Sequence, residues 1–280
     1  MTPTRVEVGW ADRLLQLEAL QISGPADGPL LVFLHEGLGS VSMWRDFPTQ
    51  LCERLGARGL VYSRPGYGRS TPRAQDERWG VDFMHRQAHE VLPALLQTLK
   101  VQEPIWLVGH SDGGSIALLY AARHGSAANG QSQAPEAPPL AGAIVLAPHI
   151  LVEDVSVRSI EQARQAYLHT DLRQRLARHH DDPDSAFWGW NDIWLSPAFR
   201  SWSIEADLHR IKVPVLAVQG VDDEYGTLEQ VRGIARRVPQ TELLELPACG
   251  HSPHRDQPQA LMEAVAGFVG RHAARDHQGP

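Results

Sequence analysis

The chain has 280 residues, a mass of 31.0 kDa and a formal net charge of −7 at pH 7, and 42% of its residues are hydrophobic. This balance is typical of a globular protein and excludes a disordered chain of low hydrophobicity. The negative charge provides no attraction to nucleic acids or to anionic membranes, so we expect neither as a partner.

Short apolar runs alternate with amphipathic segments along the chain. Residues 15–22 carry apolar side chains at largely every second position, which predicts a half-buried antiparallel hairpin near the N-terminus. Continuous apolar runs, typical of strands covered on both faces, follow at residues 30–34, 60–62, 105–108, 143–146 and 215–218, with a weaker one at 243–246. Helical patterns lie between them, at residues 47–55, 81–99, 115–122, 228–238 and 259–273. The alternation predicts an α/β fold with a mostly parallel central sheet flanked by helices.

Two regions interrupt this alternation. Residues 125–139 are polar and rich in Pro and Gly, which indicates a surface loop without chemistry of its own. Residues 149–209 have helical character and hold four of the eight tryptophans. Because this second region lies between two predicted core strands, we expect a helical cap at residues 149–209, inserted into a core formed by residues 1–148 and 210–280.

The sharpest chemical signal follows the strand predicted at residues 105–108. Residues 109–113 read GHSDG, which matches the G-x-S-x-G pattern, and a predicted helix follows directly. A tight turn at this point lifts the Ser111 hydroxyl above the sheet and places the free N–H groups of a helix N-terminus behind it. A serine hydroxyl is a poor nucleophile near neutral pH, so this reading requires a base close by.

Candidate bases and acids follow two later strands. The acidic residues 222–224 come after the strand at residues 215–218, and His251 comes after the strand at residues 243–246. The order Ser, Asp, His is the order expected for this architecture. With the motifs HEGLG at residues 35–39 and RPGYGRS at residues 64–70, the sequence resembles the α/β-hydrolase superfamily over nearly its whole length.

The resemblance implies a role for each position that matches the motifs. Ser111 corresponds to the nucleophile and His251, which follows a glycine, to the general base. The acid usually lies three residues after the glycine that ends its strand, which from Gly220 gives Asp223; Asp222 stays open as the alternative. His254 lacks a preceding glycine, so we expect it to lie behind the site or at the surface.

The same resemblance implies an oxyanion hole built from two backbone N–H groups. One belongs to Asp112, the residue after the nucleophile, and the other to Gly37, with Leu38 as an alternative donor. The implied activity is that of a serine hydrolase that cleaves a carboxylic ester, thioester or lactone through an acyl-enzyme, without a metal or cofactor. Two alternatives stay open: a carbon–carbon bond hydrolase of a vinylogous diketone with the same triad, and a non-catalytic receptor of small ligands.

The sequence departs from the family pattern at two acidic positions. Many relatives have glycine after the loop histidine, where this chain has Glu36, and the residue after the nucleophile is Asp112. Carboxylates close to a developing anion oppose it unless they are paired or turned away. Either both side chains orient loops through hydrogen bonds, or the pocket disfavours acidic substrates and accepts neutral or cationic ones.

Other residues are candidates for contacts with the substrate. Glu36, Leu38 and the tryptophans Trp190, Trp194 and Trp202 are expected at the pocket, since caps commonly exclude water from a triad. Three arginines are the cations to inspect for a substrate carboxylate: Arg45, Arg86 and Arg200. The run HHDD at residues 179–182 is expected to be a solvated helix end, because adjacent side chains point apart on a helix. The pair His85 and His89 is not expected to bind metal, since no third ligand at suitable spacing accompanies it.

The remaining expectations concern location and partners. Cys52 and Cys249 form no disulfide framework and are expected to be reduced. The first residues lack an apolar signal-peptide run and no stretch is long enough to span a membrane, so we expect a cytoplasmic protein. A small-molecule substrate is the expected partner, and a homodimer stays open.

Overall fold

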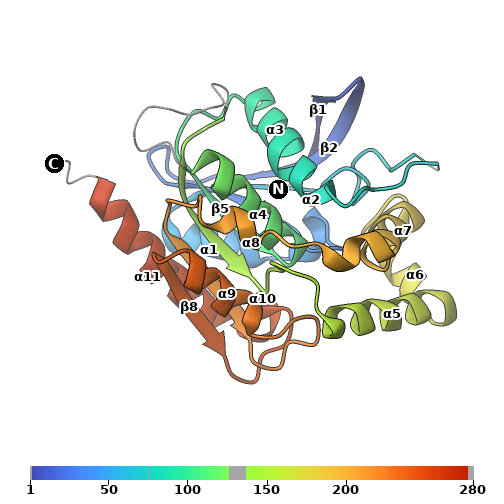
Figure 1. The fold of residues 1–280 in the computed structure, drawn as a ribbon. Helices are drawn as coiled ribbons and strands as arrows, with labels where there is room; N and C mark the ends of the chain where they lie inside the picture. Colours follow the sequence, from blue (N-terminus) through green and yellow to red (C-terminus); the bar gives the residue numbers. More distant parts are fainter. Residues whose placement is uncertain (1, 75, 126–136, 277–280) are drawn as a thin grey trace.

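A computed structural model describes residues 2–74, 76–125 and 137–276. Most of the loop predicted at residues 125–139 lies outside them. Within the described residues, eight strands form one sheet in the order β1-β2-β4-β3-β5-β6-β7-β8 (Figure 1). The strands are β1 (Thr4–Trp10), β2 (Arg13–Ile22), β3 (Leu30–Leu34), β4 (Arg58–Tyr62), β5 (Ile105–His110), β6 (Leu140–Leu146), β7 (Val215–Gly220) and β8 (Thr241–Leu246).

Strands β3 to β8 run parallel, and the predicted N-terminal hairpin β1–β2 joins them antiparallel through β4. In the centre of the sheet Leu34 pairs with Tyr62 on one side and with Gly109 on the other. Because the carboxyl ends of parallel strands reach the same edge, the loops after β3, β5, β7 and β8 emerge together. The α/β fold predicted from the alternation of elements is confirmed.

Helices connect the strands in the order that the sequence predicts. They are α1 (Phe47–Leu55), α2 (Phe83–Arg86), α3 (Leu92–Thr98), α4 (Asp112–His124), α5 (Asp154–His169), α6 (Leu172–Leu176), α7 (Pro183–Trp194), α8 (Glu205–Leu208), α9 (Glu229–Arg237), α10 (Pro253–Asp256) and α11 (Pro258–Asp276). Short 3₁₀ turns are η1 (Val41–Trp44) and η4 (Pro197–Ser201), and η2 (Gln87–Val91) is a π-helical turn.

One predicted helix is interrupted. The single helix expected at residues 81–99 is split into α2 and α3 by the π-helical turn η2. Pro93 supplies the physical reason, because it has no N–H to donate to the carbonyl of His89 one turn earlier.

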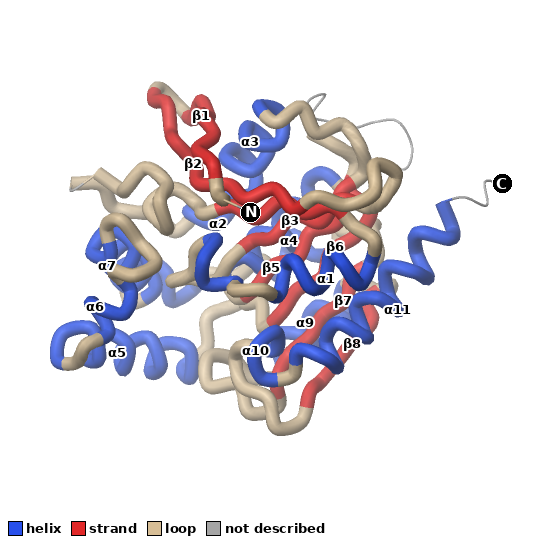
Figure 2. The backbone as a smooth tube through the Cα atoms, turned by 180° about the vertical axis from the view of Figure 1, so that it is seen from behind, coloured by secondary structure: helices blue, strands red, loops and turns tan. Residues whose placement is uncertain are grey.

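The sheet carries an apolar core on each face. Alternate residues of β3 divide between them: Leu30, Val32 and Leu34 pack with α2, α3 and α4, whereas Leu31 and Phe33 pack with α1 and α11. Figure 2 shows α1 and α11 crossing the sheet on the second face. Each residue of β3 is therefore buried on one face of the sheet or the other, as the continuous hydrophobicity of this strand predicts.

The chain between β6 and β7, residues 147–214, contains α5 to α8 and η4; we call it the β6–β7 segment. α5, α6 and α7 lie together beside the sheet in both views (Figures 1 and 2). A bridge between Leu151 and Ser203 joins the two ends of the segment. Among the helices of the described residues, none combines the length and the hydropathy that a membrane-spanning segment requires.

Candidate active site

Ser111 occupies a strained turn between β5 and α4. Its φ of 53° and ψ of −120° are unusual for a residue with a side chain. A Cβ on Gly109 would lie 2.2 Å from the carbonyl oxygen of Gly113, and a Cβ on Gly113 would lie 2.0 Å from that of Leu34. Backbone therefore occupies the space that any larger side chain would need, and only glycine fits on either side of Ser111.

The structure brings Ser111 together with His251 and Asp223. Ser111 Oγ lies 3.0 Å from His251 Nε2, and His251 Nδ1 lies 2.8 Å from Asp223 Oδ1. The Asp223 carboxylate also accepts hydrogen bonds from the Tyr225 N–H at 2.8 Å and from Gln219 Nε2 at 3.0 Å. Burial opposes ionisation of this carboxyl, but the hydrogen bond and charge of His251 hold the pKa of Asp223 below its usual value.

The two acidic residues beside Asp223, Asp222 and Glu224, make different contacts. Asp222 is exposed, and its backbone N–H donates to the carbonyl of Cys249. The Glu224 side chain accepts a hydrogen bond from the backbone N–H of His251 at 3.1 Å. Of the adjacent pair left open by the sequence, it is thus Asp223 that meets the imidazole of His251.

Gly37 and Asp112, the residues of the two expected oxyanion donors, line one small cavity. Gly37 follows β3 and Asp112 is the first residue of α4, and among the described residues neither backbone N–H donates a hydrogen bond within the protein. The cavity has a volume of about 110 Å³. Its lining consists of Glu36, Gly37, Leu38, His110, Ser111, Asp112, His149, Ile160, Trp190, Trp194, Tyr225, His251 and Ser252.

The carboxylate of Asp112 is buried between Trp194 and Arg64. One oxygen accepts a hydrogen bond from Trp194 Nε1 at 3.2 Å, and the other lies 3.9 Å from Arg64 Nη2. Burial raises the pKa of Asp112 to about 6, although the positive charge of Arg64 acts in the opposite direction. The Asp112 side chain therefore has contacts of the kind expected in the first of the two interpretations, in which it orients a loop through hydrogen bonds.

The carboxylate of Glu36 also has partners close by. Its carboxylate lies 3.4 Å from His110 Nδ1 and 3.7 Å from Arg255 Nη2. Burial would raise the pKa of Glu36, but the contacts with His110 outweigh it and hold the pKa well below its usual range. His110 Nε2 in turn lies 2.7 Å from the carbonyl oxygen of His251, so this cluster links the loop after β3 with the loop after β8.

The expected tryptophans do not all reach the cavity. Trp190 and Trp194 line it from α7, where their spacing of four residues places them on one helix face. Trp202 does not line it; its ring stacks on Phe199 at 5.1 Å and lies behind Trp194. The physical reason is that α7 ends at Trp194, so the helical spacing does not continue to Trp202.

The inspected arginines also lie elsewhere. Arg45 is exposed after η1, Arg86 stacks on the Trp10 ring, and Arg200 pairs with Asp154. Not one of these three arginines lines the cavity beside Ser111.

Sequence reasoning missed several residues of the cavity. His149 follows β6 and places its ring 5.8 Å from that of His251, and the Tyr225 ring lies 4.7 Å from His251 on another side. Burial lowers the pKa of His149 to about 3, so its imidazole is neutral at pH 7. The position of His149 in the sequence was the signal that could have found it. His149 follows the carboxyl end of β6, and the neighbouring strands β5 and β7 lead to Ser111 and Asp223.

Two other histidines are buried, His180 against expectation and His254 in one of its two expected places, behind the site. His180, expected at a solvated helix end, is buried: its Nδ1 accepts the N–H of Gly68 at 2.8 Å and its Nε2 lies 3.0 Å from the carbonyl of Leu38. His254 is also buried, with its ring 4.9 Å from that of His110. In the described part of the chain, no group of three or more His, Cys, Asp or Glu side chains could hold a metal ion.

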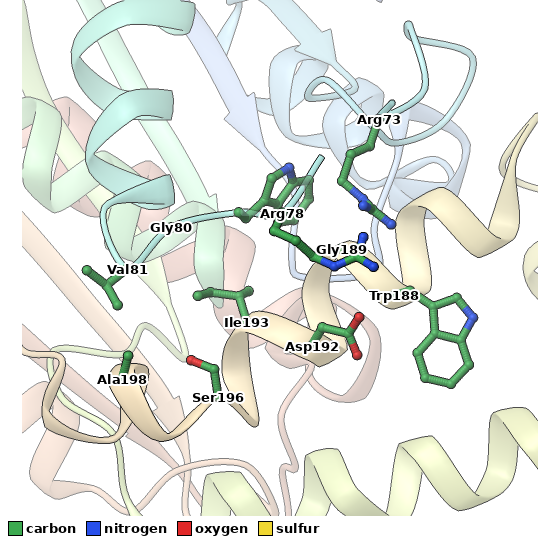
Figure 3. Close-up of a pocket in the computed structure, with 11 residues that line it drawn as sticks. Arg73, Arg78, Gly80, Val81, Trp188, Gly189, Asp192, Ile193, Ser196 and Ala198 are labelled. Carbon is green, nitrogen blue, oxygen red and sulfur yellow. The ribbon is translucent and has the colours of Figure 1, made fainter. Parts of the chain in front are cut away.

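A second cavity of about 240 Å³ lies on another face of α7 (Figure 3). Arg73 and Arg78 reach toward the helix there, beside Trp188 and Asp192. The residues that line this cavity include neither Ser111 nor His251, so it is separate from the cavity of the candidate site.

Comparisons with known proteins agree with this architecture. A bifunctional esterase/perhydrolase from Acinetobacter calcoaceticus is 24% identical, over 88% of this chain and 93% of its own. An sn-1-specific diacylglycerol lipase from Mus musculus is 26% identical, over 92% of this chain and 86% of its own. The solved structure of a thermophilic esterase from Thermogutta terrifontis superposes with a TM-score of 0.70 at 18% identity, covering 97% of this chain and 100% of that one, which shows a shared fold.

The family comparison covers most of the chain. The model of the alpha/beta hydrolase family matches residues 31–264, from β3 to the middle of α11. Together with the related esterases and lipases, this match identifies an enzyme of the hydrolase type. The chain belongs to the alpha/beta hydrolase family.

Proposed function

We propose that the protein is a serine hydrolase that cleaves a short, uncharged carboxylic ester, thioester or lactone through an acyl-enzyme. His251 Nε2 takes the proton of Ser111 while Oγ attacks the carbonyl carbon, and the imidazolium then gives this proton to the leaving group. Water, deprotonated by the same imidazole, attacks the acyl carbon and releases the acid. Asp223 holds the Nδ1–H tautomer of His251 and stabilises the imidazolium.

The backbone N–H groups of Gly37 and Asp112 are the proposed oxyanion donors. Both residues line the cavity that Ser111 enters, and α4 adds the partial positive charge of its N-terminus. Each donor of this kind typically contributes about 3 to 4 kcal/mol to the transition state.

The size and charge of the cavity support the proposed substrate class. Its volume of about 110 Å³ is well below the roughly 300 to 1,000 Å³ of pockets for drug-sized ligands. It accommodates roughly four groups of the size of water, as in an acetyl or butyryl chain. Its lining contains the carboxylates of Glu36 and Asp112 and three histidines but no Lys or Arg, so neither of these cations is present to pair with a substrate carboxylate.

The observation that carries the proposal is the hydrogen-bonded chain from Ser111 through His251 to Asp223. The test compares wild type with Ser111→Ala on p-nitrophenyl acetate, butyrate and octanoate, and labels both with a fluorophosphonate. We expect labelling at Ser111 alone and a loss of turnover of roughly 10⁴-fold or more in the variant. A folded wild type that neither labels nor hydrolyses any ester would contradict the proposal and favour a receptor for small ligands.

A second measurement tests the charge of the substrate. Matched esters that differ only in a terminal carboxylate on the acyl chain are compared by kcat/KM. We expect the neutral ester to be preferred, and a clear preference for the anionic ester would refute the assignment of an uncharged acyl group.

A further inference from the structure

The peptide bond between Glu36 and Gly37 is held by an unusual number of hydrogen bonds. The Glu36 carbonyl oxygen accepts from His35 Nδ1 at 2.7 Å, from Arg64 Nη2 at 2.8 Å and from the Gly39 N–H at 3.0 Å. The described chain contains no cis peptide bond, so the N–H of Gly37 points opposite to this carbonyl. Three donors to the carbonyl therefore fix the direction of the Gly37 N–H, and Gly37 lines the cavity.

Arg64 makes one of these three hydrogen bonds itself and orients the donor of a second, His35. Its guanidinium donates directly to the Glu36 carbonyl, and its backbone N–H donates to His35 Nε2 at 3.0 Å. Because Nε2 accepts this hydrogen bond, the proton of the neutral imidazole lies on Nδ1, where it is donated to Glu36. Burial and the charge of Arg64 hold the pKa of His35 well below its usual value, which keeps the ring in this neutral form.

Arg64 also reaches the second oxyanion residue. Its Nη2 lies 3.9 Å from the carboxylate of Asp112, whose own backbone N–H is the other proposed donor. The guanidinium is 1% exposed and stacks on the Tyr67 ring at 4.7 Å, so its position is fixed by packing. One positive charge thus lies behind both donors, at a place where solvent does not screen it.

We propose that Arg64 is the positioning residue of the oxyanion hole, which it orients through the Glu36 carbonyl and polarises with its charge. This inference rests on the proposed serine hydrolase function. A hydrogen bond to a peptide carbonyl withdraws electron density from the N–H of the same peptide, which strengthens that N–H as a donor. The effect grows as negative charge develops on the substrate oxygen, so Arg64 stabilises the transition state more than the bound ester.

The test measures kcat and KM for Arg64→Met and Arg64→Lys on the short p-nitrophenyl ester that wild type hydrolyses best. We expect kcat to fall by about 10²-fold in Arg64→Met, with KM within about twofold of wild type. Arg64→Lys keeps the positive charge but not the planar guanidinium group, so we expect its kcat to lie between those of wild type and Arg64→Met. Arg73→Met is the matched control: it removes an arginine from the same loop that lines the second cavity in Figure 3 and is expected to leave kcat unchanged.

An inhibitor separates positioning from a merely structural role. A short alkyl trifluoromethyl ketone forms an adduct with the Ser111 hydroxyl that carries an oxyanion, whereas the corresponding amide binds without forming one. We expect the inhibition constant of the ketone to rise in Arg64→Met by the same factor as kcat falls, and that of the amide to stay constant.

Three results overturn the inference. They are a folded Arg64→Met with kcat within about threefold of wild type, an unchanged affinity for the ketone, and equal losses of affinity for ketone and amide. Folding is checked by near-ultraviolet circular dichroism, and if Arg64→Met does not fold, Arg64→Lys is tested by the same two inhibitors. A wild type without esterase activity would instead contradict the proposed function, which distinguishes the two failures.

Discussion

The loops at the carboxyl edge of the sheet and the β6–β7 segment position their residues by different means. In the loops, backbone packs against backbone: a Cβ on Gly113 would lie 2.0 Å from the carbonyl of Leu34, and one on Gly220 would lie 2.1 Å from that of Cys249. In the β6–β7 segment, the side chains of Trp190 and Trp194 line the cavity from α7, and Trp194 Nε1 donates to the Asp112 carboxylate. The proposed catalytic residues thus lie in loops whose glycines leave no space for a side chain, whereas the residues that line the cavity from α7 can change.

The largest effect is expected within the loops, at the acid that contacts His251. Asp223→Asn keeps the shape of the side chain but removes the negative charge that holds the imidazole tautomer, so we expect kcat to fall by about 10⁴-fold. Asp222→Asn changes the exposed neighbour and is expected to keep kcat within about threefold of wild type. Steady-state kinetics of both variants on one ester give the answer, and similar losses in the two would show that the turn as a whole, rather than Asp223, is required.

A smaller effect follows from the close backbone packing itself. Gly113→Ala places a methyl group against the carbonyl of Leu34, and we expect the free energy of unfolding to fall by about 3 kcal/mol. Gly270→Ala, in α11, meets nothing within 4 Å and is expected to stabilise the protein by about 0.5 to 1 kcal/mol. Urea denaturation measures both, and a Gly113→Ala variant as stable as wild type would refute the view that backbone contacts fix the turn.

The sequence predicts the loop residues well because their signals are local. An apolar strand that is followed by a G-x-S-x-G motif, or by a glycine and a histidine, indicates both the strand and the position of its carboxyl end. Adjacent residues in a turn share such a signal, so Asp222 stayed open as the alternative to the favoured Asp223 until the structure placed Asp223 beside His251.

The residues around the triad could not be predicted in this way because their contacts depend on packing. His149 and Tyr225 come from different loops, and only the assembled sheet brings both rings to His251. Trp190 and Trp194 share a helix face, whereas Trp202 follows η4 and turns behind them. A pattern of tryptophans indicates a packed segment, but it does not say which side chains reach the cavity.

A third prediction concerns the junction between the two regions, where His180 joins the β6–β7 segment to the loops. Burial lowers the pKa of His180 to about 4, below the unfolded value near 6.5. The folded state binds fewer protons, so this contribution to stability is complete above pH 6.5 and is lost as the pH falls toward 4. Between pH 7 and pH 5 the loss is about 2 kcal/mol.

His180→Gln removes this titrating group. We therefore expect the gap in the free energy of unfolding between wild type and the variant to shrink by about 2 kcal/mol from pH 7 to pH 5. The exposed His209→Gln, measured at the same two pH values, serves as the matched control. A gap that does not change between pH 7 and pH 5 would contradict the lowered pKa of His180 in the folded state.

The smallest effect is expected in the β6–β7 segment, at the wall of the cavity. Trp190 lies so close to Gly37 that a Cβ on the glycine would be 2.2 Å from Trp190 Nε1, so the ring limits the space beside the proposed oxyanion donor. Trp190→Leu opens that space, and each methylene of a longer acyl chain that becomes buried contributes about 0.8 kcal/mol.

For hexanoate against butyrate, two additional methylenes correspond to a rise of roughly tenfold in the ratio of kcat/KM values in Trp190→Leu. Trp202→Leu, which changes a ring behind the wall, is the control and is expected to leave this ratio unchanged. Equal shifts in the two variants would indicate that the whole segment loosens. A shift confined to Trp190→Leu would locate acyl-chain selection in a side chain that the triad does not need, which is the separation of chemistry from specificity that the two regions imply.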